Sequence, residues 1–153
     1  MLSSCENVTT TNYEATALVT YTWQVEYIPN PDKPIRNRRE KFASVSLPNR
    51  NGERPIDAVS GPDDKGLWWP AIPPRPTIDE IEERQRSSQE EVRTPQLIKS
   101  VDYSITYEDD GQQVTVPTNY SVYRQVVRAY PEQRPLELTI AADERFVTKA
   151  DPR

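Results

Sequence analysis

Proline is the feature that most constrains how this chain folds: fifteen of its 153 residues are proline, and only four are glycine. Proline fixes φ and donates no backbone N–H, so it interrupts helices and strands and stiffens the connections between them. Seven of the prolines and three of the glycines fall between residues 48 and 76. This stretch is predicted to be a long loop with turns and polyproline II segments, between ordered strands.

Alternation of apolar and polar residues predicts about six strands in the rest of the chain. The clearest strand runs from Thr16 to Ile28, where Val19, Tyr21, Trp23, Val25 and Tyr27 alternate with polar residues. The sequence Asp109-Asp110-Gly111 predicts a tight hairpin turn, because Asp-Gly accepts the positive φ angles that such turns need. The other strands are expected at 42–47, 96–107, 112–116, 120–130 and 136–142, with a short edge strand at 146–149.

One helix is expected directly after the proline-rich loop. Thr77 and Glu80 have the spacing of a capping box, so a helix should begin at Ile78 and extend, largely exposed, toward Glu91. The predicted fold class is therefore mainly β (α+β): an antiparallel sheet or a sandwich of about six strands, with one short helix at 77–91 and a long Pro-rich loop at 48–76. Residues 16–150 are expected to form a single β-rich domain after a flexible tether at 1–15.

Composition argues against most catalytic and metal chemistry. The chain has no histidine and a single cysteine, which excludes Ser/His/Asp and Cys/His nucleophile systems, imidazole zinc sites and an internal disulfide. The paired carboxylates, at 63–64, 82–83, 90–91 and 109–110, fall on expected loops or on the exposed helix, where they keep ordinary pKa values. We therefore expect no enzyme, no cofactor and no metal; a carboxylate hydrolase would need one acid buried near a second.

Charge argues against a nucleic-acid partner. The formal net charge is −5 and the pI is about 4.9, whereas proteins that bind phosphate backbones present a basic face. One basic stretch stands out, formed by Arg36, Arg38, Arg39 and Lys41. It is expected to be a solvated loop between two strands, with a contact to anionic lipid or to an acidic partner as the alternative.

The N-terminus carries the sole cysteine in a recognisable setting. Leu2-Ser3-Ser4-Cys5 resembles the lipobox of bacterial lipoproteins, in which a leucine and two small residues precede the cysteine that receives the lipid. The resemblance covers four residues and implies lipidation of Cys5. Only Met1 precedes the motif, so export would require a longer signal peptide upstream. The alternative is a cytosolic terminus with an incidental cysteine.

An aromatic cluster lies inside the proline-rich loop, at Leu67-Trp68-Trp69-Pro70-Ala71-Ile72-Pro73-Pro74. A stiff loop that presents tryptophan at low entropic cost is typical of an interaction hot spot. The alternative is that Trp68 and Trp69 fold back over one sheet edge and complete the core. Residues 67–70 of this cluster, followed by 75–81, resemble uncharacterised lipoproteins of photosynthetic bacteria, which implies an envelope or thylakoid setting.

These observations predict a non-enzymatic accessory module that binds another protein and is membrane-anchored through lipidated Cys5, on the periplasmic or thylakoid-lumen side. The expected partner contacts are Trp68, Trp69, Pro70, Pro73 and Pro74. The alternative function is a small-ligand or sugar-binding domain that uses the aromatic face of Tyr21, Trp23 and Tyr27. The alternative location is the cytoplasm.

Overall fold

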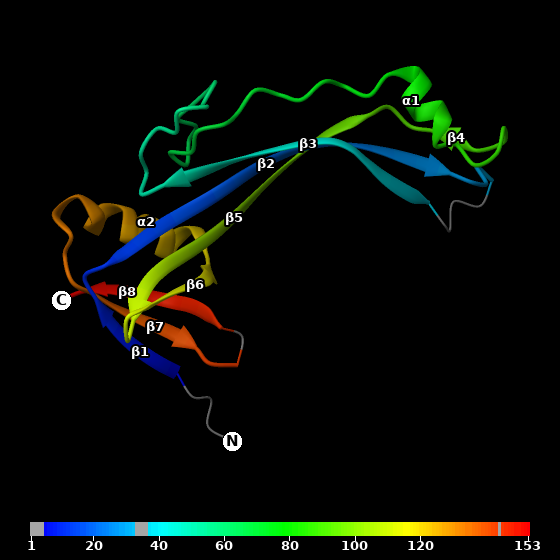
Figure 1. Cartoon of the computed structure of the whole chain (residues 1–153). Coiled ribbons are helices and arrows are strands. Elements are labelled where there is room, and N and C mark those ends of the chain that lie inside the picture. The colour runs from blue at the N-terminus through cyan, green and yellow to red at the C-terminus, as the bar shows by residue number, and fades with distance from the viewer. Residues whose placement is uncertain (1–4, 33–36, 144) are drawn as a thin grey trace. The chain divides into compact units, whose positions relative to one another are not determined.

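The protein is mainly β in the computed structural model, which describes residues 5–32, 37–143 and 145–153. Within these residues, eight strands form one sheet in the order β1-β7-β8-β6-β5-β2-β3, and β4 pairs with β2 outside that path. The strands are β1 Cys5–Thr10, β2 Tyr13–Ile28, β3 Arg38–Arg50, β4 Glu91–Val92, β5 Gln96–Asp109, β6 Gln112–Thr118, β7 Leu136–Ala141 and β8 Phe146–Pro152. The helices are α1 Ile78–Glu83 and α2 Tyr120–Ala129, followed by a 3-10 turn at Tyr130–Glu132 (Figure 1).

The expected mainly β class is confirmed, but the sheet has more strands than six and is mixed. β6 pairs with β8 in parallel, whereas β1 with β7, β5 with β6 and β7 with β8 are antiparallel. A parallel pair needs a long crossover connection. Helix α2 and strand β7 supply that crossover between β6 and β8.

The chain divides into two compact units, and strands of both belong to the one sheet. Unit 1 contains the chain up to Val19, Leu47–Trp69 and Val101–Arg153, and unit 2 contains Thr20–Ser46 and Pro70–Ser100. The long strands β2, β3 and β5 each contribute residues to both units.

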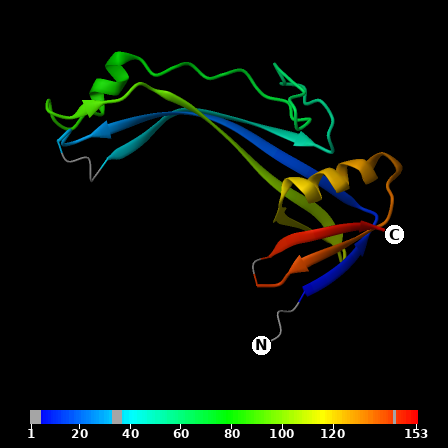
Figure 2. The same ribbon diagram turned by 180° about the vertical axis from the view of Figure 1, so that it is seen from behind.

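Unit 1 holds most of the buried apolar side chains. Helix α2 packs against β8 (Figure 2). Its Val122, Tyr123, Val126 and Ala129 are buried, and alternate residues of the strands point inward. The inward-facing strand residues include Ala15, Ala17, Val19, Ile105, Val116, Leu136, Leu138, Ile140, Val147 and Ala150.

Helix α2 corrects the strand expected at 120–130. Its buried positions 122, 123, 126 and 129 follow the helical repeat, and the alternation of Val and Tyr had suggested a period of two instead. Asn119 fixes the start of the helix, because its side-chain oxygen accepts the amide N–H of Val122 at 2.9 Å.

Part of the segment expected to be a flexible tether, at 1–15, lies in a strand. Described residues Cys5–Thr10 form β1, which pairs with β7 from Cys5 opposite Ala141 to Thr10 opposite Leu136. Its Val8 is buried, which gives the strand a side chain to anchor in the core. The final strand also differs from expectation: β8 lies between β7 and β6 and is not an edge.

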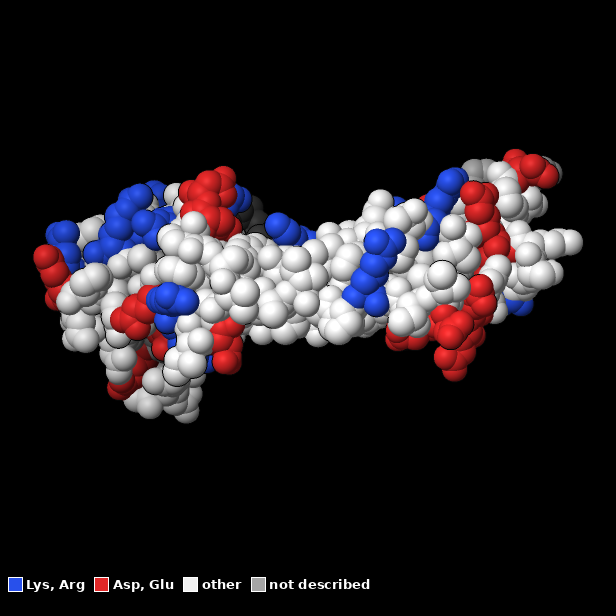
Figure 3. Space-filling view, turned by 90° about the horizontal axis from the view of Figure 1, so that it is seen from above, with Lys and Arg blue, Asp and Glu red and all other residues white. Residues whose placement is uncertain are grey.

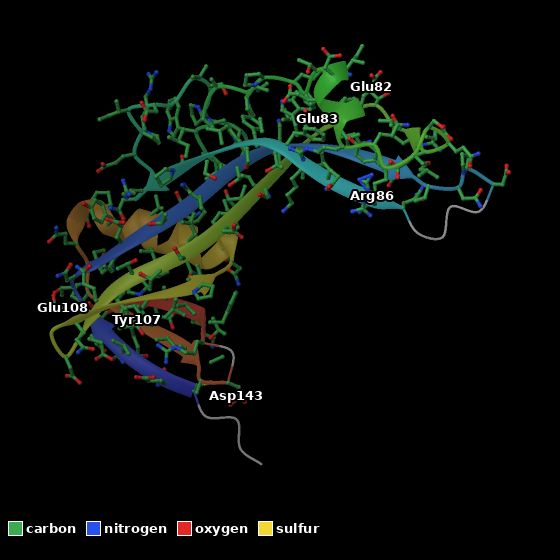
Figure 4. The ribbon with its side chains drawn as sticks, turned by 45° about the vertical axis from the view of Figure 1, so that its right-hand side comes forward. Glu82, Glu83, Arg86, Tyr107, Glu108 and Asp143 are labelled. Carbon is green, nitrogen blue, oxygen red and sulfur yellow. The ribbon has the colours of Figure 1, made fainter. Side chains whose placement is uncertain are left out.

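The hairpin of β5 and β6 is confirmed. Asp110 and Gly111 form its turn with φ of 50° and 77°, and Asp109 pairs with Gln112. Positive φ at both central residues is the geometry that the Asp-Gly sequence favours. Near the end of β5, Glu108 (Figure 4) accepts a hydrogen bond from the side chain of Asn12 at 2.7 Å.

Unit 2 has a small core over β2. Val25, Tyr27 and Ile81 are buried together, with Phe42 and Val92 packed against them. The capping box that starts α1 is confirmed, with the Glu80 amide donating to Thr77 and the Glu80 carboxylate accepting the Thr77 amide. The helix ends at Glu83, well before Glu91, because Ile81 is its only buried side chain.

Candidate functional site

The loop at 51–69 in unit 1 is ordered by a carboxylate near its middle. One oxygen of Asp63 accepts the amides of Lys65 and Leu67, each at 2.9 Å, and the other accepts the indole N–H of Trp69 at 2.8 Å. The Asp63 amide in turn donates to the Leu67 carbonyl at 3.0 Å. Asp63 therefore closes a tight turn and fixes the tryptophan that follows it.

These contacts also set the charge state of Asp63. Burial opposes its ionisation, but the Trp69 indole and the amides of Leu67 and Lys65 outweigh that effect and hold the pKa of the carboxyl below its ordinary value. Asp63 is thus a structural anion at neutral pH.

A buried amide on β3 holds the same loop from the other side. Asn49 is fully buried, and its side chain accepts the Trp68 amide at 2.8 Å and donates to the Trp68 carbonyl at 3.0 Å. Next to it, Trp69 forms an antiparallel bridge with Ser60. Gly52 lies so close to Val127 of α2 that a Cβ there would meet the Val127 methyl at 2.7 Å. The loop is therefore fastened to the sheet and to the helix.

The two tryptophans expected to anchor a partner differ in exposure. Trp69 is 8% exposed, so it has the position that the packing alternative describes, and the neighbouring Leu67 is 1% exposed. Trp68 is half-buried, with the Arg54 guanidinium 5.1 Å from its ring centroid. The remaining expected contacts lie in unit 2, where Pro70 is buried, Pro73 is half-buried and Pro74 is exposed.

The loop instead exposes two aliphatic side chains that the sequence reading did not single out. Ile56 is 100% exposed and Val59 is 67% exposed. Ile56 forms one wall of a groove of about 330 Å³, lined by Leu47, Pro48, Arg50, Glu53, Arg54, Pro55, Ile56 and Asp57. The sequence signal was present, because Pro55-Ile56-Asp57-Ala58-Val59 places apolar residues in a loop with no regular period to bury them.

The aromatic face expected to bind a small ligand lies in unit 2 and is covered. Tyr21 and Tyr27 are buried, and the Tyr27 hydroxyl donates to the Ile81 carbonyl at 2.7 Å. Trp23 is half-buried, and its indole N–H donates to the Pro73 carbonyl at 2.7 Å. The three rings therefore offer no open platform.

Two polar grooves lie elsewhere. One of about 480 Å³ in unit 2 is lined by Gln24, Glu26, Arg39, Arg93, Thr94, Gln96 and Ile98. The other, of about 550 Å³ in unit 1, is lined by Thr11, Asn12, Tyr13, Glu14, Asn51, Thr106, Tyr107, Gln113, Tyr130 and Gln133. Tyr13 and Tyr107 are themselves buried, so they expose little ring surface for a ligand to stack on.

One of the paired carboxylates is buried, contrary to the expected exposed positions. Glu90 is 5% exposed; it accepts from Arg38 at 2.8 Å and from the Arg86 amide at 3.0 Å. Arg38 lies over the Tyr27 ring, 4.2 Å from its centroid. The basic stretch is therefore not a solvated loop: Arg38 belongs to β3 and to this ion pair, Arg39 and Lys41 are exposed on β3, and Arg36 is outside the described residues.

The electrostatics of Glu90 do not suit proton donation. Burial opposes its ionisation, but the Arg86 amide and the Arg38 guanidinium outweigh that effect and hold the pKa of Glu90 below its ordinary value. A general acid needs a raised pKa. The pair at Glu82 and Glu83 is exposed on α1, where acidic side chains gather over the helix (Figures 3 and 4).

Cys5 is a free, exposed thiol at the first residue of β1, and the rest of the lipobox-like motif precedes the described part of the chain. The described residues contain no cluster of three or more acidic or cysteine side chains that could hold a metal ion. Among the helices described, none is long and apolar enough to cross a membrane.

Comparison with protein-family models, with curated proteins and with solved structures gives no match for this chain.

Proposed function

We propose that this protein is a non-catalytic interaction module, and that it docks another protein through the outer part of the loop at 51–69. The single observation that carries this proposal is the complete exposure of Ile56 on a loop held in place by Asp63 and Asn49. Because the loop is fastened at both sides, binding there would immobilise few additional groups. The proposed partner contact is therefore the exposed part of the loop around Ile56, and no longer Trp68 and Trp69.

The chemistry of this surface is that of a small apolar anchor beside a mixed-charge groove. Ile56 and Val59 offer the apolar contact, while Arg50 and Arg54 alternate with Glu53 and Asp57 around it. Charged groups at the rim of an interface set register and partner choice more than affinity. The fitting partner presents an apolar pocket flanked by charges of both signs.

Ile56→Asp together with Val59→Asp tests this surface in the full-length protein. We expect the double variant to lose co-purification with the native partner while its unfolding free energy changes by no more than about 0.5 kcal/mol, because both positions are exposed. Ile78→Asp is the matched control, since Ile78 is 72% exposed but lies on α1. Retained partner binding by the double variant, or equal loss in the control, would contradict the assignment.

We also propose that Cys5 carries a lipid that places the protein on the periplasmic or luminal side of a membrane. The support is the Leu2-Ser3-Ser4-Cys5 motif and the position of the only cysteine, exposed at the start of β1. Metabolic labelling with an alkynyl fatty acid should tag the native protein and leave Cys5→Ser untagged. Native protein that is isolated with an unmodified Cys5 thiol would refute the lipid anchor and leave the Ile56 surface unaffected.

A further inference from the structure

Residues 70–76 of unit 2, Pro-Ala-Ile-Pro-Pro-Arg-Pro, show a period of three in their burial. Pro70 and Pro76 are buried and Pro73 is half-buried, whereas the residues between them are exposed. Three residues per turn is the repeat of the left-handed polyproline II helix, which the four prolines favour. The burial pattern and the prolines are those of a short polyproline II rod with one face turned inward, and the segment appears in Figure 1 as an extended trace that leads to α1.

Trp23 meets the inward face of this rod. Its indole N–H donates to the Pro73 carbonyl at 2.7 Å, and the Arg75 guanidinium lies 5.9 Å from the centroid of its ring. A polyproline II backbone makes no internal hydrogen bonds, so its carbonyls are free to accept from a side chain. The indole N–H can only donate, so it can bond a backbone carbonyl of the segment but cannot accept from a backbone N–H. These contacts have the form in which aromatic grooves bind Pro-x-x-Pro peptides.

The rod is held by few bonds. Among the described residues, the hydrogen bond from Trp23 is the only one that residues 70–76 make. Ala71, Ile72, Pro74 and Arg75 are exposed. A covering segment with no strand pairing and a single hydrogen bond can leave at low cost, in contrast to the loop at 51–69, which Asp63 and Asn49 fasten.

We propose that the Trp23 surface is a recognition site for proline-rich chains in polyproline II conformation, and that residues 70–76 occupy it as an internal ligand. The partner is a Pro-x-x-Pro-x-Arg segment of another protein, which would exchange with the internal one. Residues 70–76 show which features the partner segment needs. These are prolines at every third position, a backbone carbonyl that accepts from the Trp23 indole, and a guanidinium that lies over the Trp23 ring. This surface is separate from Ile56 and does not depend on it.

An internal ligand competes strongly, because tethering gives it an effective concentration in the millimolar range. A free peptide of the same sequence should therefore bind the native chain weakly. Weakening the internal segment should raise the apparent affinity for the free peptide by about tenfold or more, since the competent state becomes populated.

The test uses a fluorescein-labelled peptide Pro-Ala-Ile-Pro-Pro-Arg-Pro and fluorescence anisotropy with the full chain. In the variant Pro70→Ala/Pro73→Ala/Pro76→Ala, we expect at least about tenfold tighter binding than in the native chain. A peptide with every proline replaced by alanine should not bind. Adding Trp23→Phe, which keeps an aromatic ring and removes the indole donor, should weaken binding by about fivefold or more, as expected for a lost hydrogen bond.

Circular dichroism and the two indole resonances of Trp68 and Trp69 report whether the variant remains folded. If the triple variant unfolds, Pro73→Ala alone provides the same comparison, because it retains Pro70 and Pro76. Equal binding of the proline and alanine peptides would overturn the proposal. So would a folded variant that binds the proline peptide no better than the native chain does.

Discussion

Two buried side chains decide much of the local structure, and both are polar. The Asn49 side chain bonds both the backbone N–H and the carbonyl of Trp68, as a neighbouring strand would. The Glu90 carboxylate accepts hydrogen bonds from the Arg38 guanidinium and from the Arg86 amide. Buried polar groups of this kind cost free energy unless every bond is made. Around Glu90 one atom lacks a partner among the described residues, the Nε of Arg38. The loss of either member of this ion pair should therefore be costly.

Glu90→Ala should lower the unfolding free energy by about 3 kcal/mol, because it leaves the largely buried Arg38 charge with only the longer contact to Glu40, at 3.9 Å. Glu91→Ala is the matched control: its side chain is 44% exposed in a surface pair with Arg93 and should contribute less than about 1 kcal/mol. Urea denaturation of the two variants gives the comparison. Similar losses for both would show that the Arg38–Glu90 pair does not stabilise unit 2.

At the scale of elements, the sequence predicted structure best where local chemistry dominates. The Asp110-Gly111 turn and the Thr77 capping box each depend on two or three neighbouring residues, and both were predictable. Helix α2 was not predicted, because Tyr120, Val122 and Val126 favour strands locally and only burial against β8 selects the helix. Strand β1 was missed for a related reason: its partner β7 is more than a hundred residues away in the chain.

The candidate site could be predicted only in part. The segment that carries it, between residues 48 and 76, was recognised from its prolines and tryptophans. The sequence did not predict which of its apolar residues face solvent: Trp69 is buried with its indole N–H bonded to Asp63, while Ile56 is exposed. A polyproline II rod was foreseeable from composition, but its contact with Trp23 joins positions about fifty residues apart.

Strand β3 shows how an element can depart from simple alternation. Phe42 and Ala43 are both half-buried, so the inward positions change from even-numbered residues before this point to odd-numbered residues after it. This shift resembles a bulge, which lets Arg38 and Phe42 face the small core of unit 2 while Leu47 and Asn49 face inward in unit 1.

Helix α2 provides a prediction at this scale. Asn119→Ala should remove the side-chain acceptor for the Val122 amide and lower the unfolding free energy by about 1 kcal/mol. Asn119→Asp should retain most of it, because a carboxylate accepts the same bond and favours a helix N-terminus. Thermal unfolding followed by circular dichroism distinguishes the two. Equal loss in both variants would mean that the amide group of Asn119 has a role other than capping.

For the whole molecule, both units contain a carboxylate that should make the free energy of unfolding depend on pH. Each has a carboxylate whose pKa is held below its ordinary value, Asp63 in unit 1 and Glu90 in unit 2. In the unfolded chain these groups titrate near about pH 4. Their stabilisation is therefore complete above that pH and is lost as the pH falls through the lower folded-state values.

We accordingly expect the unfolding free energy of the native chain to decrease steeply below about pH 4.5, as measured by urea denaturation from pH 7 to pH 3. Asp63→Asn and Glu90→Gln should each be less stable at neutral pH and should each show a shallower decrease in acid. Asp64→Asn, at an exposed neighbouring position, is the control and should follow the native curve. Parallel curves for all four proteins would mean that other groups control the acid response.

The pairing of Cys5 with Ala141 limits how far from the membrane a lipidated form of this protein could extend. A lipoprotein with a long unstructured tether can sample a wide region above its bilayer, whereas here the residue that would carry the lipid is the first of strand β1. Bilayer and sheet would be separated by little more than the glyceryl linkage. In that form, the edge of unit 1 where Cys5 pairs with Ala141 would lie at the headgroups, and a partner that docks on unit 1 would meet the protein close to the membrane.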